Sequence, residues 1–501
     1  MNRQSIVLLG SAVVFVAMLY LMSTSTSKRP ASNYEVGEVE PLVLFCAASN
    51  RAVVESIRAK YEKEFHRPIQ IQYGASQTLL SSIEVSGTGD LFLPADDSFV
   101  DLGREKGLLS EVFPLATMRG VVAVRRGNPK GIQSFFDLSR AEVRVVQASP
   151  DASAIGKRTR ETLTELSLWD GLETATLAFR TTVTDVANDL VVDSADAGIV
   201  YDAVLRTYPD LEPIELPELK GIVSQVSLAV ISGSKQPQAA IHFARYIAAR
   251  DRGLKHYAEH GFLIASGDVW SDVPELTVFA GSMLRPAIDE TIVAFEQREG
   301  VRVTRVYNGC GILVAQMKAG QHPDAYFACD REFMNQVPDL FPKPIDVSIN
   351  ELVILVQKGN PLGIEVLRDL TKPGLRVGVG HEKQCAMGWL TQNTLREGGV
   401  QLEVMENVTV QSPTGDMLVN QLRAGSLDAA VAYLSNAAGA ADYLDAIPIQ
   451  GLSCSVAVQP YAVAEGSTNA QLAERLFQKI CSAESQEIFQ AEGFRWQNPK
   501  P

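Results

Sequence analysis

Hydrophobic and polar positions along the chain predict short strands followed by amphipathic helices. Leu42–Ala47 is a run of apolar, β-branched and aromatic residues. Ala52–Glu64 then carries apolar residues at helical spacing, and Ile69–Tyr73 alternates between apolar and polar positions, as a half-exposed strand does. A strand, a helix and a second strand in this order predict a β-α-β unit, which implies a parallel sheet.

The same succession of predicted elements occurs again later in the chain. A strand-like run at Leu276–Ala280 is followed by a helical pattern at Ala287–Glu299 and by a second strand-like run at Val301–Tyr307. The spacing is regular, because Tyr73 and Tyr307 are 234 positions apart. The pattern therefore indicates two copies of one domain.

Two turns support this duplication. Residues 120–125 form a predicted strand that ends at the turn RGNP, and residues 351–357 form one that ends at the related turn KGNP. Asn128 and Asn360 in these turns are 232 positions apart. Because the period is far above the ~20–50 residues of solenoid repeats, we expect each copy to fold around its own core.

The repeat divides the 501 residues into four predicted segments. Residues 1–22 form a membrane anchor or signal segment, and residues 23–40 form a flexible tether. Residues 41–270 form the first domain, called copy one, and residues 275–497 form the second, called copy two. The composition, with 46% apolar and 21% charged residues, is typical of soluble domains.

Residues 6–22 form a stretch of 17 residues without a charge, which follows Arg3. This stretch is longer than the roughly 7–15 apolar residues of a secretory signal and short for a membrane-spanning helix of roughly 17–25 residues. An uncleaved anchor and a cleaved signal both stay open as interpretations. Either one exports the remainder, so we expect a periplasmic or extracytoplasmic protein. The uncleaved anchor is the favoured interpretation, and in it residues 6–22 tether the protein to the inner membrane.

The net charge of −14 argues against nucleic acid as a partner. Binding to a phosphate backbone needs clustered Lys and Arg, and the sequence has no basic run. The same charge implies that the field of the whole protein does not gather anions. Any anion bound here must be held by local hydrogen-bond donors.

Patterns typical of enzymes are missing from the sequence. None of the six histidines lies in an HExxH arrangement, and there is no P-loop or nucleophile elbow. The adjacent Asp96 and Asp97 would point to opposite faces of a strand, and the equivalent Asp330 stands alone, which favours a structural turn or cap. We therefore predict a binding protein without enzymatic activity and without a cofactor.

Small hydroxyl residues follow three predicted strands of copy one. Ser49 follows the first strand, Ser76 follows the second, and Ser153 precedes a later helix. In open α/β sheets, ligands bind beyond the carboxyl ends of strands, where helix N-termini present unpaired N–H groups. Each serine alone is more simply a helix N-cap, but three at successive sheet ends predict an anion pocket built from uncharged donors.

Several motifs together carry a family resemblance. They are the strand followed by AAS, YGAS, GDLFLPADDSFVDLGREKGLL, RGNP, DAGIVY and the terminal SAESQEIFQAEGF. In this order and spacing, the residues from Leu42 to Phe262 and from Leu276 to Phe494 resemble the periplasmic molybdate-binding proteins of ABC importers. The resemblance implies an α/β fold with two tandem type II periplasmic-binding domains, each of two α/β lobes around a central ligand cleft.

In that family, serine hydroxyls and backbone amides hold a tetrahedral oxyanion between two lobes. The resemblance implies molybdate or tungstate as the ligand of copy one, sulfate next, and delivery to an ABC permease. Phosphate is less favoured because its proton needs an acceptor, although Asp185 next to the site keeps it open. The implied oxyanion-binding residues of copy one are Ser49, Ser76, Ser153, Ala154, Val183 and Tyr201.

Copy two differs at the corresponding positions, although Ser282 would restore one hydroxyl if the chain shifted locally by one residue. Thiol and thioether groups are much weaker hydrogen-bond partners than hydroxyls, so we expect copy two to be a poorer oxyanion site. The corresponding residues are Ser282 and Met283 for Ser49, Cys310 for Ser76, Cys385 for Ser153, and Ala386, Gly415 and Tyr433 for Ala154, Val183 and Tyr201.

Cysteine usage also differs between the copies. Cys46 of copy one lies in an apolar strand and is most simply a buried small hydrophobe. The resemblance implies that Cys310 and Cys385 face each other across the cleft of copy two. A disulfide that locks the copy shut, a soft-metal site at these two cysteines, and thiols that fill a decayed pocket all stay open. The sequence does not determine the pairing among Cys310, Cys329, Cys385, Cys454 and Cys481.

Two other functions remain as alternatives to transport. One is a sensor or scaffold protein in which the duplicated domain serves a partner protein. The other is a soft-metal-binding protein that works through the cysteines of copy two; no CxxC or His-rich spacing supports it.

Overall fold

The structure is a computed structural model that describes residues 39–500. The predicted anchor or signal segment, residues 1–22, and nearly all of the predicted tether lie outside the described residues. From Leu42 on, the chain forms one compact unit. No helix among the described residues is both long and apolar enough to span a bilayer.

Copy one alternates strands and helices as its hydrophobic pattern predicts. Its strands are β1 (Leu42–Ala47), β2 (Ile69–Gly74), β3 (Leu91–Leu93), β4 (Leu109–Arg125), β5 (Val145–Ala148), β6 (Thr176–Arg180), β7 (Ala197–Tyr201), β8 (Leu211–Ile214), β9 (Val223–Ile231) and β10 (Leu263–Ile264). Its α-helices are α2 (Arg51–Phe65), α3 (Ser76–Ser86), α4 (Ser98–Glu105), α5 (Ala154–Glu165), α6 (Trp169–Ala175), α7 (Val183–Val191), α8 (Asp202–Leu205), α9 (Pro237–Ala248) and α10 (Gly253–Glu259).

Copy two repeats this series. Its strands are β11 (Glu275–Gly281), β12 (Arg302–Asn308), β13 (Ala325–Phe327), β14 (Ile345–Gln357), β15 (Val377–Gly380), β16 (Val408–Ser412), β17 (Ala429–Tyr433), β18 (Leu444–Pro448), β19 (Val456–Val463) and β20 (Arg495–Trp496). Its α-helices are α11 (Arg285–Glu299), α12 (Cys310–Lys318), α13 (Arg331–Met334), α14 (Ala386–Glu397), α15 (Gln401–Asn407), α16 (Gly415–Arg423), α17 (Leu434–Ala438), α18 (Ala470–Ile480) and α19 (Ala483–Ala491).

The strand order is the same in the two copies. In copy one it is β2-β1-β3-β9-β4-β7-β5-β6, and in copy two it is β12-β11-β13-β19-β14-β17-β15-β16. The predicted parallel pairing of the first two strands is present in both copies, as β1 with β2 and β11 with β12. The α/β fold class and its duplication are therefore confirmed.

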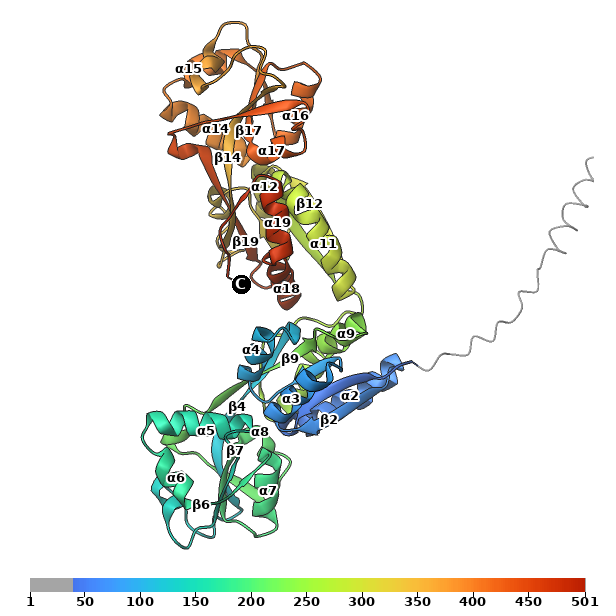
Figure 1. Ribbon diagram of the computed structural model, residues 1–501, viewed down its shortest axis with the longest axis vertical. Coiled ribbons are helices and arrows are strands. Elements are labelled where there is room, and N and C mark those ends of the chain that lie inside the picture. Colours follow the sequence, from blue (N-terminus) through green and yellow to red (C-terminus); the bar gives the residue numbers. More distant parts are fainter. Residues whose placement is uncertain (1–38, 501) are drawn as a thin grey trace, which may run out of the picture. The chain divides into compact units, whose positions relative to one another are not determined.

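Each copy has two lobes that share one long strand. The first part of β4, residues 109–119, pairs with β9, and the last part, residues 120–125, pairs with β7 and β8. Residues 120–125, predicted to form a strand that ends at the turn RGNP, are the last part of β4, because the chain continues without a turn from one lobe to the other. The chain returns to the first lobe between β8 and β9. Figure 1 shows α2, α3 and α9 with the first lobe of copy one, and α5, α6 and α7 around β6 and β7 in the second.

Buried apolar side chains form one cluster in each copy. The first cluster extends from Leu42 to Phe262, and the second extends from Leu276 to Phe494. Their separation confirms the expectation that each copy is large enough to bury its own core.

The repeated GNP turns have a structural explanation. Gly127 and Asn128 both have positive φ, 83° and 44°. Asn128 Nδ2 donates to the Ile132 carbonyl oxygen at 2.8 Å, and its Oδ1 accepts the Ile132 N–H at 2.9 Å. Asn360 (φ 46°) makes the same pair of bonds with Ile364 in copy two. Asparagine is used here because it tolerates the left-handed region and closes the loop with its side chain.

We expect Asn128→Ala to lower the free energy of unfolding by about 2–3 kcal/mol, because two hydrogen bonds are lost and alanine is strained at positive φ. Asn128→Gly also removes both hydrogen bonds, but glycine adopts a positive φ without strain, so it should lower the free energy of unfolding by less. Thermal unfolding midpoints of both variants, with Asn360→Ala as the matched change in copy two, measure this. Equal, negligible shifts for all three variants would contradict this explanation of the turn.

Candidate functional site

A small cavity in copy one brings together all six residues predicted to bind an oxyanion. Its volume is about 20 Å³, a little above the roughly 10–15 Å³ that one water molecule requires. The lining residues are Ala47, Ala48, Ser49, Gly74, Ala75, Ser76, Ala95, Ser153, Ala154, Thr182, Val183 and Tyr201.

Helix N-termini from both lobes reach this cavity. Ser76 is the first residue of α3 in the first lobe, and Ala154 and Val183 are the first residues of α5 and α7 in the second. The first N–H groups of a helix have no partner within the helix, and the helix dipole makes this end partly positive. Three such ends around one cavity form a set of donors suited to a small anion.

The serine hydroxyls add further donors. Ser49 Oγ is buried and has no hydrogen-bond partner among the residues that the structure describes. Ser76 Oγ accepts the N–H of Ala95 at 3.1 Å, which leaves its own hydrogen to donate. The Ser49 hydroxyl lines the cavity, and a buried hydroxyl without a partner costs free energy.

The hydroxyl of Tyr201, which the predicted set contains besides the three serines, is engaged elsewhere. Tyr201 lines the cavity, but its hydroxyl is 2.7 Å from Ser224 Oγ and is fully buried. Burial raises the pKa of Tyr201 well above its usual range, so the phenol stays neutral. Tyr201 therefore forms a neutral part of the cavity wall, and its hydroxyl is held in place by Ser224.

All twelve lining residues are uncharged. The nearby Asp185 lies outside the lining, and its carboxylate accepts hydrogen bonds from the N–H and Oγ1 of Thr182 at 3.0 and 2.7 Å. These bonds cap the N-terminus of α7. Asp185 thus accepts two hydrogen bonds through Oδ2 from its own helix start, and no carboxylate lines the cavity.

An ion pair joins the two lobes of copy one beside this cavity. Asp96 follows β3 in the first lobe, and Arg158 lies on α5 in the second. Arg158 Nε and Nη2 donate to the two carboxylate oxygens of Asp96, both at 2.9 Å, and the Asp96 side chain is only 1% exposed. Lys157 Nζ also donates to Ser98 Oγ at 3.3 Å. We call Asp96, Ser98, Lys157 and Arg158 the interlobe clasp.

The two adjacent aspartates are thus structural, as the sequence favours. The hydrogen bonds that Arg158 donates to Asp96 raise the pKa of Arg158. Asp97 instead accepts a hydrogen bond from Ser227 Oγ at 2.9 Å, and burial raises the pKa of Asp97 to about 6. One carboxylate bonds the opposite lobe and the other bonds its own sheet, so they do not act on a common group.

Copy two has other groups where copy one has hydroxyls. Met283 occupies the position of Ser49, since the short helical turns Ala48–Asn50 and Ser282–Leu284 correspond without a shift. The local shift that would have put Ser282 in the place of Ser49 is therefore not present. Cys310 begins α12 and Cys385 precedes α14, as Ser76 and Ser153 do in copy one, and Tyr433 keeps a buried hydroxyl that lacks a partner among the described residues.

Five positions of the copy-two cleft are glycines. Atoms of other residues occupy the space that a side chain at each of these positions would fill. A Cβ on Gly309 would lie 2.4 Å from the carbonyl oxygen of Gln384, and one on Gly415 would lie 2.2 Å from Asn436 Oδ1. At Gly309 the lobes therefore approach more closely than alanine would allow, whereas Gly415 makes room for Asn436 within the second lobe. The five glycines and their copy-one counterparts are Gly281 and Ala47, Gly309 and Ala75, Gly311 and Gln77, Gly380 and Ala148, and Gly415 and Val183.

Backbone hydrogen bonds link the lobes of both copies at one place. In copy one, the Gln77 N–H donates to the Ala152 carbonyl oxygen at 3.2 Å. In copy two, the Gln384 carbonyl oxygen accepts from both Gly311 and Ile312, at 3.0 and 3.3 Å. The N-terminus of α12 is thus satisfied by the protein itself to a larger extent than that of α3.

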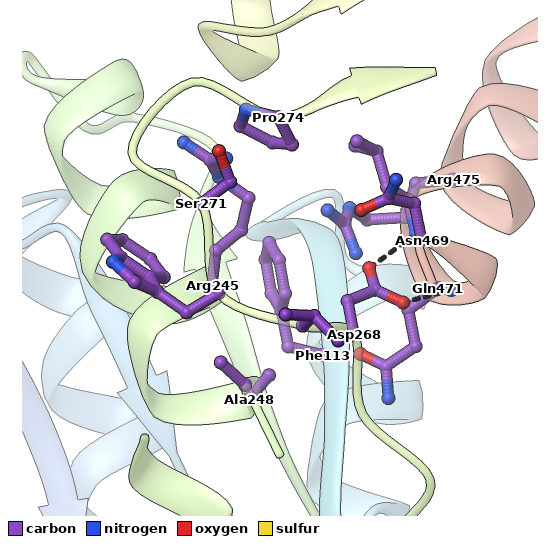
Figure 2. A pocket seen from close by; sticks show the side chains of 13 residues that line it. Phe113, Arg245, Ala248, Asp268, Ser271, Pro274, Asn469, Gln471 and Arg475 are labelled. Carbon is purple, nitrogen blue, oxygen red and sulfur yellow. Dashed lines mark hydrogen bonds between the residues drawn. The ribbon is translucent and has the colours of Figure 1, made fainter. Parts of the chain in front are cut away.

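A second cavity of about 20 Å³ lies at the segment that joins the copies (Figure 2). Of its charged lining residues, Arg475 pairs with Glu299 at 2.8 Å, and Asp268 accepts the N–H groups of Gln471 and Leu472 at 2.8 and 3.0 Å. Asp268 thereby caps the first turn of α18. Arg245 Nη2 donates to the Asp272 carbonyl oxygen at 3.3 Å, while its Nε and Nη1 have no partner among the described residues. These contacts show that the residues around this cavity pack the joining segment against α18.

The described residues contain no group of three or more His, Cys, Asp and Glu side chains arranged to hold a metal ion. The predicted soft-metal interpretation of Cys310 and Cys385 therefore gains no third ligand of these types from the described chain. Cys385 Sγ instead lies 3.6 Å from the His381 carbonyl oxygen and 3.5 Å from that of Ser412.

Sequence reasoning missed the interlobe clasp. A signal was available, because Asp330 retains the Asp96 position while Leu390 replaces Arg158. Without an arginine, burial raises the pKa of Asp330 to about 6. A comparison of the copies at the residues next to the pocket, and not only in it, would have pointed to Arg158.

The sequence of the chain matches a known family twice. A model of the family described as bacterial extracellular solute-binding protein matches residues 42–263 and again residues 276–495. These two matches, together with the two lobes of each copy, confirm the predicted resemblance and the tandem type II periplasmic-binding domains.

Individual relatives each match about half of the chain. The molybdate-binding protein ModA of Mycobacterium tuberculosis is 28% identical over 246 residues, which cover 48% of this chain and 91% of that protein. A putative ABC transporter substrate-binding lipoprotein of Bacillus subtilis, YvgL, is 26% identical over 265 residues, which cover 50% of this chain and 96% of that protein.

Solved structures also match about half of this chain. The periplasmic molybdate-binding protein of Azotobacter vinelandii matches with a TM-score of 0.40 and 16% identity, covering 45% of this chain and 100% of that one. The substrate-binding domain of a putative molybdenum ABC transporter of Clostridium difficile matches with a TM-score of 0.37 and 24% identity, covering 45% and 99%.

We expect Arg158→Met to lower the free energy of unfolding by about 1–3 kcal/mol, because Asp96 is left buried without its cationic partner. Arg160→Met is the matched control: Arg160 lies on the same helix and pairs with Asp151 within one lobe, 43% and 83% exposed, so its loss should stay within about 0.5 kcal/mol.

The measurement is the thermal unfolding midpoint of the two variants and of the double variant Asp96→Asn with Arg158→Met. The double variant should recover part of the loss, since no unpaired buried charge remains. Similar midpoints for Arg158→Met and Arg160→Met would show that the clasp does not hold the lobes.

Proposed function

Because the chain belongs to the family of bacterial extracellular solute-binding proteins, we propose that copy one captures a tetrahedral oxyanion by closure of its two lobes. Molybdate or tungstate is the favoured ligand, and sulfate is next. The bound form then delivers the anion to an ABC permease.

One observation carries this proposal: the buried Ser49 hydroxyl has no partner among the described residues and faces an uncharged cavity shared with Ser76 and three helix N-termini. Each hydrogen bond from a neutral donor to a charged oxygen contributes about 1.5–3 kcal/mol. Several of them together can replace the water that a dianion loses on entering the cavity.

The chemistry of the lining favours a fully deprotonated anion. A protonated phosphate would need an acceptor for its hydrogen, and none of the twelve lining residues carries a carboxylate. The carboxylate of Asp185 lies outside the lining and accepts two hydrogen bonds from Thr182 through Oδ2. Molybdate, tungstate and sulfate need donors only. The name of the mycobacterial relative, a molybdate-binding protein, supports placing molybdate first.

The role in transport rests on the relatives. The Bacillus relative is named as an ABC transporter substrate-binding lipoprotein, which supports an ABC permease as the partner and an extracytoplasmic location. Residues 6–22 would supply the membrane tether in this chain. The family is one of binding proteins, which supports a role without catalysis.

Copy two is not proposed as a second receptor. Its cleft has Met283 and Cys310 in place of the serines, and Gln384 takes up donors of the α12 N-terminus. The protein should therefore bind one oxyanion per chain. Copy two then serves as a folded companion of the receptor domain.

Isothermal titration of the purified protein with molybdate, tungstate, sulfate and phosphate tests the proposal. We expect binding of molybdate or tungstate at one site per chain. Ser49→Ala should weaken it about 10- to 100-fold, since one charge-assisted hydrogen bond of roughly 1.5–3 kcal/mol is lost.

Ser56→Ala is a matched control, because Ser56 lies on the same helix region and its Oγ donates to the Val53 carbonyl oxygen at 2.8 Å, outside the cavity lining. Its affinity should equal that of the unmodified protein. Absence of heat with all four anions, or equal affinity of Ser49→Ala and the unmodified protein, would overturn the proposal.

A further inference from the structure

Two cysteines of copy two lie in direct sulfur contact. Cys310 Sγ and Cys329 Sγ are 2.6 Å apart, and both side chains are buried. The bond between the sulfurs of a disulfide is about 2.05 Å, whereas unbonded atoms of this size stay well beyond 3 Å apart. The pair is therefore much nearer to a covalent bond than to ordinary packing.

The two sulfurs lie in space that a glycine, Gly281, leaves free. A Cβ on Gly281 would lie 2.0 Å from Cys329 Sγ and 3.1 Å from Cys310 Sγ. In copy one the same two positions are Ala47 and Ala95. Copy two therefore lacks the methyl group that copy one has at Ala47, and the sulfur of Cys329 fills the space that a methyl group on residue 281 would occupy.

The first cysteine is held in the same way as the serine it replaces. Cys310 Sγ accepts the N–H of Cys329 at 3.1 Å, as Ser76 Oγ accepts the N–H of Ala95 at 3.1 Å. The orientation of the side chain at this position is therefore common to both copies. What copy two adds is the second sulfur on the residue that donates the N–H.

A metal ion does not fit between these two sulfurs. Thiolate ligands lie about 2.3 Å from a zinc ion, so two sulfurs that share the ion must be much farther apart than 2.6 Å. The third buried thiol of the cleft, Cys385, is near the carbonyl oxygens of His381 and Ser412 in its own lobe. The geometry thus favours a bond within the first lobe of copy two, between Cys310 and Cys329.

We propose that Cys310 and Cys329 form a disulfide in the mature protein. The two thiols lose two protons and two electrons, and one S–S bond forms. The electrons reduce the disulfide of an oxidant, either a thiol–disulfide oxidoreductase or oxidised glutathione, which becomes two thiols. The bond ties the first turn of α12 to the chain directly after β13.

The disulfide has a consequence for the cleft of copy two. At the position where Ser76 offers a hydroxyl hydrogen, an oxidised Cys310 has no hydrogen to donate. The bridge therefore removes this oxyanion donor and at the same time fixes the wall of the cleft, which closes a loop of about twenty residues in the unfolded chain.

The bond should form while the chain folds. The hydrogen bond to Cys310 and burial raise the pKa of the Cys329 thiol, and the thiolate is the form that attacks a disulfide. In the folded protein the pair is shielded from an oxidant. A chain that reaches an oxidising compartment unfolded meets no such barrier.

The test is a peptide map without reduction. The full chain is unfolded and reduced, refolded in a buffer of reduced and oxidised glutathione, blocked with an alkylating agent and cut with trypsin. Cys310 lies in the fragment 306–318 and Cys329 in the fragment 319–331, so the expected product is these two fragments joined, and it should disappear after reduction.

Three results would overturn the proposal: both fragments alkylated, either fragment carrying only glutathione, or the fragment 306–318 joined to the fragment 384–396 that contains Cys385. The control Cys454→Ser should leave the joined product intact, since Cys454 lies far along the chain and is only partly buried. The variant Cys329→Ser should remove the product and leave Cys310 open to alkylation.

A second measurement uses the unmodified protein, so it does not depend on whether a variant folds. Protein that is unfolded, reduced and refolded in dithiothreitol should have a thermal unfolding midpoint several degrees below that of protein refolded in the glutathione buffer, and equal midpoints would mean that no bridge stabilises the fold. Neither measurement involves an oxyanion, so the outcome is independent of the function proposed for copy one.

Discussion

Helix N-termini directed into a closed cleft impose the constraint on which the rest of each copy depends. The first N–H groups of α3, α5 and α7 have no partner within their helices, and a buried N–H needs an acceptor. Copy one meets this need with a neutral cavity lined by hydroxyls. Copy two meets it in part with its own backbone, because Gln384 accepts from Gly311 and Ile312. The same fold therefore supports two different solutions to one electrostatic requirement.

The divergence of copy two is coordinated, which distinguishes it from simple decay. Loss of side chains from a cleft without compensation would leave cavities that destabilise the fold. Here the space released at Gly281 is filled by Cys329, that at Gly309 by the carbonyl of Gln384, and that at Gly415 by Asn436. Each small residue is matched by an atom from another segment, so the cleft of copy two is packed and not merely emptied.

The fold and the duplication could be predicted from the sequence, because strand and helix periodicity and the repeat are local or regularly spaced signals. The residues around the cavity were implied by the family resemblance, together with the serines that follow predicted strands. Three features needed coordinates. Asp96 and Arg158 are joined although they lie on different lobes, 62 positions apart, and no periodicity links them. Contact between Cys310 and Cys329 depends on where α12 lies against β13. The continuity of β4 through both lobes depends on pairing with β9 and β7.

The interlobe clasp bears on the lobe opening and closure that the proposed capture of an oxyanion requires. A carboxylate that is fully buried is held by a guanidinium whose side chain is 35% exposed, so water reaches one member of the pair. Partial exposure weakens such a pair relative to a fully desolvated one. The clasp therefore favours the closed lobes without making opening prohibitive, and its opposite charges cancel near a cavity that is itself uncharged. Copy two lacks the arginine, and its lobes are held by backbone hydrogen bonds and close packing around glycine, contacts that do not depend on a bound ion.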